Sequence, residues 1–321
     1  MFRENFSQRD EIIENERVTT VIKGEELSLP DTFECGQCFR YEELFAEGER
    51  RYMTVVEDEI IFVGQRRRGE IIFYGADSEK FDRIYRNYFD LDTDYSLIRD
   101  DILKRCDSDF LRRAAMSAGG IVILRQKPWE TLCSFIISQN NNIPRIRRIV
   151  REISAEYGVN LALQKNLRSC PLDAEGAPPC EEKCKKCGRC YTFPSPEDIL
   201  SRPEGLLPSR PGFRYKYILD AADKVARGEV DLKKIEEASS YEITVTELMK
   251  ILGVGLKVAS CTALFGFHNL DAFPIDVWMR RAIDEHFGGR LDHEALGEYR
   301  GIAQQYIFHY IRNLIGEDGG S

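Results

Sequence analysis

Short runs of β-branched and aromatic residues dominate the chain between residues 17 and 75. Three of these runs, at 51–56, 59–64 and 69–75, are separated by turn residues. Valine, isoleucine, tyrosine and phenylalanine at this density, broken by turns, are typical of β-strands. The pattern predicts an antiparallel meander with one covered face.

The spacing of apolar residues changes at Ser78. From there apolar side chains recur three and four positions apart, as at Phe81, Ile84, Tyr85 and Tyr88. This is the period of one face of an α-helix. The chain is therefore expected to change from strands to helices near this point.

One insertion interrupts the helical part of the chain. Residues 168–191 hold prolines, glycines and five cysteines, a composition that does not suit a core element. Nearly everything else after residue 106 has helical periodicity. We predict an α+β protein, with an N-terminal antiparallel sheet domain over residues 1–106 and a mainly α-helical domain over residues 107–321.

Composition limits the class of protein. The chain has 321 residues, 43% of them hydrophobic, which is enough for one large or two ordinary domains with cores. No apolar stretch approaches the roughly 20 residues that cross a membrane, and the first residues do not resemble a signal peptide. We expect an intracellular protein without a membrane partner, cytoplasmic or nucleoid-associated in a prokaryote and nuclear in a eukaryote.

The net charge of −9 weighs against a nucleic-acid partner, because phosphate binding needs positive potential. Net charge is a sum over the whole surface, however, and a local patch can outweigh it. Arg145, Arg147, Arg148 and Arg151 are crowded into one short stretch. A local basic surface is therefore compatible with the acidic total.

Two apolar runs meet at a glycine turn, Gly253-Val254-Gly255. Glycines let the backbone approach a ligand closely, and the unpaired amides at the start of the next helix can hold a phosphate. Carbonyl groups on the other side of the turn could hold a monovalent cation. A plain connector between two packed helices is the alternative interpretation.

Lys257 lies in the first turn of the second predicted helix. The positive end of a helix disfavours a protonated amine, and an unprotonated amine is what a nucleophile requires. Cys261 is four residues further, on the same helix face. Asp276 follows Pro274 and precedes an apolar helix, so we expect it to cap that helix. A solvated surface lysine and a purely structural cap are the alternatives.

Four segments together form a recognisable set. They are residues 35–40 with Cys-Gly-Gln-Cys-Phe-Arg, residues 137–146 with three asparagines, the hairpin with its lysine and aspartate, and residues 299–308. In this order they resemble the 8-oxoguanine DNA glycosylase family of the helix-hairpin-helix superfamily. The resemblance covers about residues 33–310 and implies a helix-hairpin-helix glycosylase domain after the sheet.

The resemblance implies roles for the matching residues. Lys257 would be the nucleophile and Asp276 the essential carboxylate. The base would be bound by the Gly36 carbonyl at its N7–H, by Cys261 and Phe308 on its two faces, and by Gln304 on its Watson–Crick edge. The implied DNA contacts are Asn140 in the gap left by the base, Arg145 and Arg214 on the widowed cytosine, Phe213 as a wedge, and Gly253, Gly255, Val258 and Val277 at the phosphates.

The implied activity is that of a bifunctional base-excision repair enzyme. It would flip 8-oxoguanine out of duplex DNA, remove it opposite cytosine, and cleave the abasic strand by β-elimination through a lysine Schiff base. No cofactor is required for this chemistry, and we expect a monomer. The alternatives are a glycosylase for another damaged base and a non-catalytic DNA-binding module.

A cysteine cluster departs from the resemblance. Cys180, Cys184, Cys187 and Cys190 have the spacing C-x3-C-x2-C-x2-C, which suits tetrahedral zinc or a 4Fe–4S cluster. We expect a structural zinc, with the iron–sulfur cluster and a metal-free loop as alternatives.

Overall fold

The computed structural model describes residues 9–14, 17–23, 27–46, 48–164 and 188–318. Its N-terminal part is one antiparallel sheet with the strand order β1-β2-β6-β5-β4-β3. The strands are β1 (Arg9–Glu14), β2 (Arg17–Lys23), β3 (Tyr41–Ala46), β4 (Glu49–Val56), β5 (Glu59–Arg67) and β6 (Glu70–Tyr74). The predicted antiparallel sheet is confirmed, and β4, β5 and β6 coincide with the three apolar runs.

A short helix, α1 (Leu29–Glu34), lies within the segment for which only strands and turns were predicted. Its start signal is present in the sequence, because the Ser28 side chain accepts a hydrogen bond from the Asp31 amide and Pro30 follows the cap. The helix packs on the sheet, where the Phe33 ring stacks on Tyr52 at 5.0 Å. It thereby begins the covered face of the sheet.

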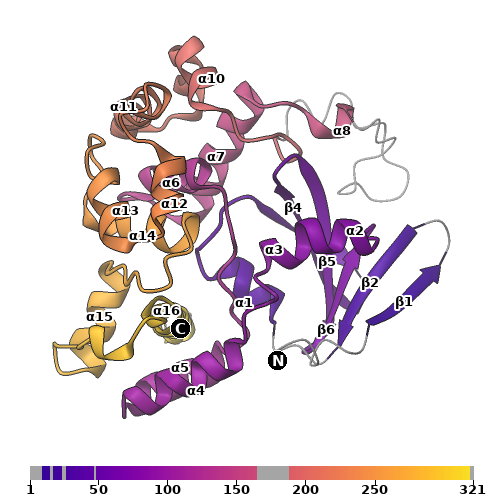
Figure 1. The fold of residues 1–321 in the computed structure, drawn as a ribbon, viewed down its shortest axis with the longest axis vertical. Coiled ribbons are helices and arrows are strands. Elements are labelled where there is room, and N and C mark those ends of the chain that lie inside the picture. The colour runs from indigo at the N-terminus through magenta and orange to yellow at the C-terminus, as the bar shows by residue number, and fades with distance from the viewer. Residues whose placement is uncertain (1–8, 15–16, 24–26, 47, 165–187, 319–321) are drawn as a thin grey trace.

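The rest of the described chain is mainly helical, and Figure 1 shows most of the helices on one side of the sheet. The larger helices are α4 (Tyr95–Arg105), α5 (Asp109–Ser117), α6 (Pro128–Ser138), α7 (Ile143–Tyr157), α11 (Tyr215–Ala226), α13 (Tyr241–Leu248), α14 (Leu256–Gly266), α15 (Val277–His286) and α16 (Arg300–Asp318). Shorter turns of helix are α2 (Ser78–Lys80), η1 (Phe81–Tyr85), α3 (Arg86–Tyr88), α8 (Leu161–Gln164), α10 (Pro196–Ser201), η2 (Pro203–Ser209), η3 (Gly212–Arg214), α12 (Leu232–Ala238) and η4 (Glu294–Leu296).

The main hydrophobic core runs without a break from one face of the sheet into the helices. Part of the opposite face is covered as well, since successive strand residues face opposite sides and a second cluster joins Met53, Val55 and Ile60 to Leu161, Ala162 and Cys190. The prediction of one covered face is therefore wrong for β4 and β5.

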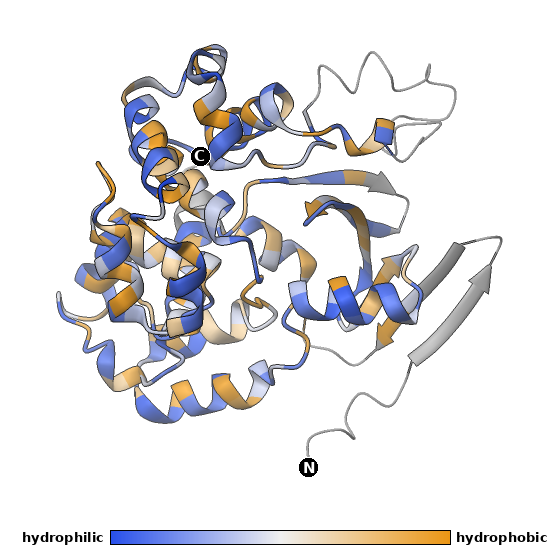
Figure 2. Cartoon of the chain, turned by 45° about the horizontal axis from the view of Figure 1, so that its top comes forward, coloured by the Kyte–Doolittle hydropathy of each residue, from blue (hydrophilic) through white to orange (hydrophobic). Residues whose placement is uncertain are grey.

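Apolar and polar residues alternate in bands along the helices (Figure 2), as amphipathic packing requires. Gln37 links the two parts, since its amide donates to the Val122 carbonyl at 2.8 Å and accepts from the Leu124 amide at 2.9 Å. The domain boundary after residue 106 stays a prediction.

Within the described part of the chain, no helix combines the length and the apolar character needed to cross a membrane.

Candidate active site

A cavity of about 480 Å³ opens between the turn after α1, the helices α6, α14 and α16, and the start of α15. The structure brings six predicted residues, far apart in the sequence, into its wall. They are Gly36, Lys257, Cys261, Asp276, Gln304 and Phe308. These are all of the residues to which catalysis or base binding was assigned.

Lys257 enters the cavity from the first turn of α14. The N-cap of this helix is Gly255, which has no side chain to cap the first amides. The Lys257 amine is half-buried, with Nζ 3.5 Å from the Ser138 hydroxyl and 5.4 Å from the centre of the Phe135 ring. Among the residues that the structure describes, no carboxylate forms an ion pair with this amine. The amine is thus placed for contact with a ligand rather than for a salt bridge.

Cys261 lies one helical turn after Lys257 and is buried. Burial raises the pKa of the Cys261 thiol, the nearby Lys257 charge lowers it, and the net change is upward. A neutral, polarisable thiol is therefore exposed to the cavity at neutral pH. Such a group can pack against the face of a flat aromatic ligand.

Asp276 caps α15, as its position after Pro274 predicted. Its Oδ1 accepts hydrogen bonds from the Trp278 amide at 3.0 Å and the Met279 amide at 2.9 Å. Both bonds use Oδ1, so Oδ1 can cap the helix while Oδ2 contacts a ligand in the cavity. The helix start fixes the carboxylate in the wall of the cavity.

Gln304 and Phe308 line the cavity from one face of α16. The Gln304 side chain is 3% exposed, and its amide donates to the Pro274 carbonyl at 3.1 Å. Opposite them lies Gly36, whose φ of +84° suits glycine. A Cβ at this position would lie 3.5 Å from the edge of the Phe308 ring. A side chain at residue 36 would therefore narrow the cavity as well as strain the backbone.

The three asparagines of the loop between α6 and α7 have different places. Asn141 donates to the Ile137 carbonyl at 3.0 Å, and Asn142 caps α7 by accepting from the Arg145 amide at 3.0 Å. Asn140 is exposed and has a left-handed backbone with φ +47°. The helix ends thus account for two asparagines, whereas the Asn140 side chain forms no hydrogen bond with the residues that the structure describes.

Arg214 holds this loop against an exposed aromatic ring. Its guanidinium is buried and donates to the carbonyls of Gln139 and Asn140. The same guanidinium lies 4.4 Å from the centre of the Phe213 ring, which is 47% exposed. Burial, together with the charge of Arg145, lowers the pKa of Arg214. The four DNA-binding candidates of this region therefore lie together, although Arg214 is engaged with backbone carbonyls.

The hairpin between α13 and α14 depends on a close approach at Gly253. This residue has φ +77°, and a Cβ on it would lie 2.5 Å from the Tyr217 ring. Gly255, by contrast, faces open space. The Val258 side chain is buried, so only its backbone could contact a ligand, whereas Val277 is 78% exposed at the start of α15.

The cysteine cluster lies mostly outside the described residues, which exclude Cys180, Cys184 and Cys187. Cys190 is described and is fully buried in a small apolar cluster with Met53. The rest of the described chain contains no group of three or more metal-binding side chains. The described residues therefore do not test the prediction of a metal at the cysteine cluster.

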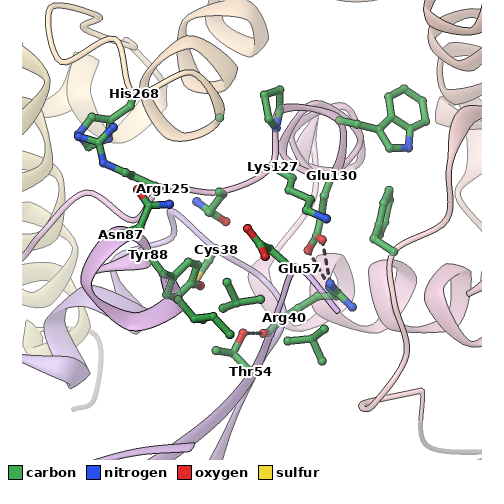
Figure 3. A pocket seen from close by; sticks show the side chains of 18 of the residues that line it. Cys38, Arg40, Thr54, Glu57, Asn87, Tyr88, Arg125, Lys127, Glu130 and His268 are labelled. Atoms are coloured by element: carbon green, nitrogen blue, oxygen red, sulfur yellow. Dashed lines mark hydrogen bonds and ion pairs between the residues drawn. The ribbon is translucent and has the colours of Figure 1, made fainter. Parts of the chain in front are cut away.

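A second cavity, of about 530 Å³, lies at the junction of the sheet and the helices (Figure 3). It contains none of the predicted site residues. The Arg40 guanidinium forms two hydrogen bonds with the Glu130 carboxylate, at 2.6 and 2.8 Å, and Arg125 pairs with Asp90 at 2.7 Å. Two of its arginines are thus held by carboxylates between the sheet and the helices, and we interpret this cavity as part of the junction.

Sequence reasoning missed several residues that line the first cavity, among them Phe135, Ser138 and Arg312. Phe135 and Ser138 precede the asparagine loop on α6 and gave no separate signal. Arg312 had a detectable one, because it continues the four-residue spacing of Gln304 and Phe308 on α16.

Comparisons with known proteins identify the family and the fold. Residues 20–132 match the family described as 8-oxoguanine DNA glycosylase, N-terminal domain. A solved structure of MBOgg1 in complex with a low-affinity DNA ligand is 33% identical, covers 96% of this chain and 99% of its own, and has a TM-score of 0.77. The Clostridium acetobutylicum 8-oxoguanine glycosylase/lyase in complex with DNA containing cytosine opposite 8-oxoG is 29% identical, with coverages of 97% and 99% and a TM-score of 0.77.

The Saccharomyces cerevisiae N-glycosylase/DNA lyase is 29% identical over 282 residues, which are 81% of this chain and 68% of the yeast protein. The 3-methyladenine DNA glycosylase of Archaeoglobus fulgidus, at 16% identity and a TM-score of 0.64, shares the fold. Fold and site together define a DNA glycosylase of the helix-hairpin-helix class. Within that class, the chain belongs to the 8-oxoguanine DNA glycosylase family.

Proposed function

We propose that the protein is a bifunctional glycosylase and abasic-site lyase that removes 8-oxoguanine from duplex DNA opposite cytosine. The observation that carries the proposal is the single cavity that holds Lys257 and Asp276 together with Gly36, Gln304 and Phe308. An amine and a carboxylate at two helix starts face three groups suited to a flat, polar base. Family membership supports the same activity.

The first step is displacement of the damaged base. The unprotonated Lys257 amine forms a bond to C1′ of the flipped nucleotide, and the glycosidic bond breaks with its electron pair going to N9 of the base. The carboxylate of Asp276 stabilises the positive charge that develops on the sugar. The half-buried position of the amine, without an ion-pair partner among the described residues, favours this role.

The second step uses the covalent link. Loss of a proton from the Lys257 nitrogen and opening of the sugar give a Schiff base between this nitrogen and C1′. Loss of a C2′ proton then expels the 3′ phosphate by β-elimination and nicks the strand. No cofactor takes part in either step.

Reaching C1′ requires extrusion of the nucleotide, which costs a few kcal/mol of stacking and pairing. Asn140 would fill the vacated position, where its amide both donates and accepts hydrogen bonds. Phe213 would act as the wedge beside it. Arg145 and Arg214 would read the cytosine, which requires the Arg214 guanidinium to exchange backbone carbonyls for the base.

Phosphate contacts would come from two helix starts: α14, which has no side-chain cap, and α15, where the Val277 amide precedes the two amides capped by Asp276. The backbones of Gly253, Gly255 and Val258 belong to the hairpin and the first turn of α14, and Val277 begins α15. Amides at a helix start attract anions through their unpaired N–H groups and the helix dipole. Carbonyls of the same turn would hold a monovalent cation. The protein would act on DNA as a monomer.

Recognition of the base would divide among four groups. The Gly36 carbonyl would accept the N7 hydrogen that distinguishes 8-oxoguanine from guanine, and Gln304 would bind the Watson–Crick edge. The ring of Phe308 and the thiol of Cys261 would enclose the two faces. The cysteine cluster would hold a structural zinc, or alternatively a 4Fe–4S cluster, with no part in the chemistry.

A nicking assay tests the proposal. Duplexes carrying 8-oxoguanine opposite each of the four bases, and other lesions opposite cytosine, are incubated with enzyme in excess. We expect base release and nicking to be fastest for 8-oxoguanine opposite cytosine. Lys257→Gln should abolish both, whereas Lys250→Gln, an exposed lysine of the same hairpin paired with Glu247, should retain them. Faster excision of another lesion would contradict the substrate assignment.

A further inference from the structure

Arg312 continues the stripe of cavity residues on α16. Gln304, Phe308 and Arg312 are four residues apart, so they lie on one helix face, and all three line the cavity. The proposed function assigns the first two to the base. It leaves the third, which is a permanent cation, without a role.

The guanidinium lies at the Gly36 side of the cavity. Its central carbon is 5.3 Å from the centre of the Phe308 ring, and Nη1 is 3.7 Å from the position of a Cβ on Gly36. A base stacked on Phe308 with its N7 edge at Gly36 would therefore have this cation at the same edge.

Two acids of α1 have other contacts. Glu34 accepts hydrogen bonds from Arg50 at 2.6 Å and from the Tyr52 hydroxyl at 2.8 Å, and Asp31 lies 3.6 Å from the His309 ring nitrogen. Among the side chains that the structure describes, none forms an ion pair with Arg312. A cation without such a partner in a binding cavity is suited to an anionic or electron-rich group of the ligand.

We propose that Arg312 binds the departing base and stabilises the negative charge that it gains; this rests on the proposed function above. When the glycosidic bond breaks, the electron pair goes to N9 and spreads over the ring to O6 and O8. The Arg312 guanidinium stays protonated and donates hydrogen bonds to this anion. The base then takes a proton from the ammonium group formed on Lys257 or from water, so that charge and protons balance.

The same contact favours the oxidised base over guanine. O8 is bonded to C8, the ring atom next to N7, so it lies beside the edge assigned to Gly36, and guanine has only a C8–H group there. A cation there gains a carbonyl acceptor with 8-oxoguanine and loses it with guanine. Arg312 thus stabilises the leaving base and adds to the preference for 8-oxoguanine over guanine.

The experiment separates base release from strand cleavage under single-turnover conditions. Arg312→Met keeps an unbranched apolar stem over Phe308 but removes the charge. We expect it to slow 8-oxoguanine release by about a hundredfold, the lower end of the range for loss of one group that stabilises developing charge. Nicking of DNA with a preformed abasic site, which has no base to lose, should stay within about twofold of wild type.

Two further variants serve as controls. Arg312→Lys retains the charge and should restore most of the base release. Arg112→Met removes an exposed arginine of α5 that pairs with Asp107 and Asp109, and it should change neither rate.

Each outcome bears on a stated claim. Equal losses of base release and abasic-site nicking in Arg312→Met would overturn the leaving-group role, as would no loss in either. Failure of Arg312→Lys to recover base release would overturn the role of the charge. If the wild-type enzyme releases no 8-oxoguanine, both this inference and the proposed function are overturned, whereas release by an unaltered Arg312→Met variant overturns this inference alone.

Discussion

Replacing Gly253 by alanine tests whether the hairpin that carries Lys257 depends on one close contact. The new Cβ would lie 2.5 Å from the Tyr217 ring, and the backbone at Gly253 has φ +77°. The left-handed backbone costs about 1–2 kcal/mol for a residue with a Cβ, and displacement of the ring costs about 1–3 kcal/mol. Loss of unfolded-state freedom returns about 0.4–1 kcal/mol. The sum predicts a decrease of roughly 2–4 kcal/mol in the free energy of unfolding.

Urea denaturation followed by circular dichroism measures this change, and thermal unfolding should show a decrease in Tm of about 3–6 °C. The matched control is Gly255→Ala, two residues away. Gly255 has open space around it, so this variant should stay within about 1 kcal/mol of wild type. Equal stability of the two variants would refute the steric reasoning at Gly253. A loss of DNA binding in Gly253→Ala without a loss of stability would also refute it.

Three other predictions concern the catalytic carboxylate, the loss of stability at low pH, and the metal. Asp276→Asn should keep the α15 cap and the free energy of unfolding, because asparagine caps about as well as aspartate. It should lower the single-turnover rate of base release by about a hundredfold or more. Unfolding and excision are measured on one preparation of the variant. Burial raises the pKa of Asp90, but the hydrogen bond with His268 and the charge of Arg125 lower it below its ordinary value. The free energy of unfolding that this carboxylate contributes is therefore complete above pH about 4 and is lost as pH falls further. Asp90→Asn should make the free energy of unfolding fall less steeply below that pH. An unchanged slope of unfolding free energy against pH would contradict the role of Asp90. Metal analysis of protein purified without chelator should find close to one equivalent of zinc, or the iron of one cluster, and less than roughly a tenth of an equivalent of either would refute the structural metal.

The sheet and the helices could be predicted because their apolar residues have clear periods. The runs that became β4, β5 and β6 alternate with turns, and the spacing of Phe81, Ile84 and Tyr85 is helical. The cap by Asp276 could also be predicted, because a proline and an apolar helix flank it. The short helix α1 was missed, since six residues are too few to show a period and its only signal was the cap at Ser28.

Contacts across long sequence separations could not be predicted from local pattern. The carbonyls that bind Arg214 belong to residues 74 and 75 positions away. The close approach of Tyr217 to Gly253 depends on how α11 packs against the hairpin. Local spacing contains no information on such pairs, so the burial of the arginine and the strict need for glycine emerge only from the packed structure.

The candidate site could be predicted as a set because four segments resemble those of the 8-oxoguanine DNA glycosylase family, whereas the residue pattern by itself pointed only to Lys257, Cys261 and Asp276. Local pattern did not place Gly36 opposite Phe308, some 270 residues away, where a Cβ on residue 36 would touch the edge of the ring. It also gave no role to Arg312, because an arginine near the end of a helix is ordinarily a solvated residue. The structure shows that both residues line the same cavity, and this contact suggests their roles.

The central claim is that Lys257 forms the covalent bond to the sugar of the damaged nucleotide. Borohydride reduction during reaction with a duplex containing 8-oxoguanine opposite cytosine should trap the enzyme on DNA. Digestion and mass spectrometry of the trapped complex should then find the sugar adduct on Lys257. An adduct on another amine, or trapping by Lys257→Gln at the wild-type level, would contradict the account.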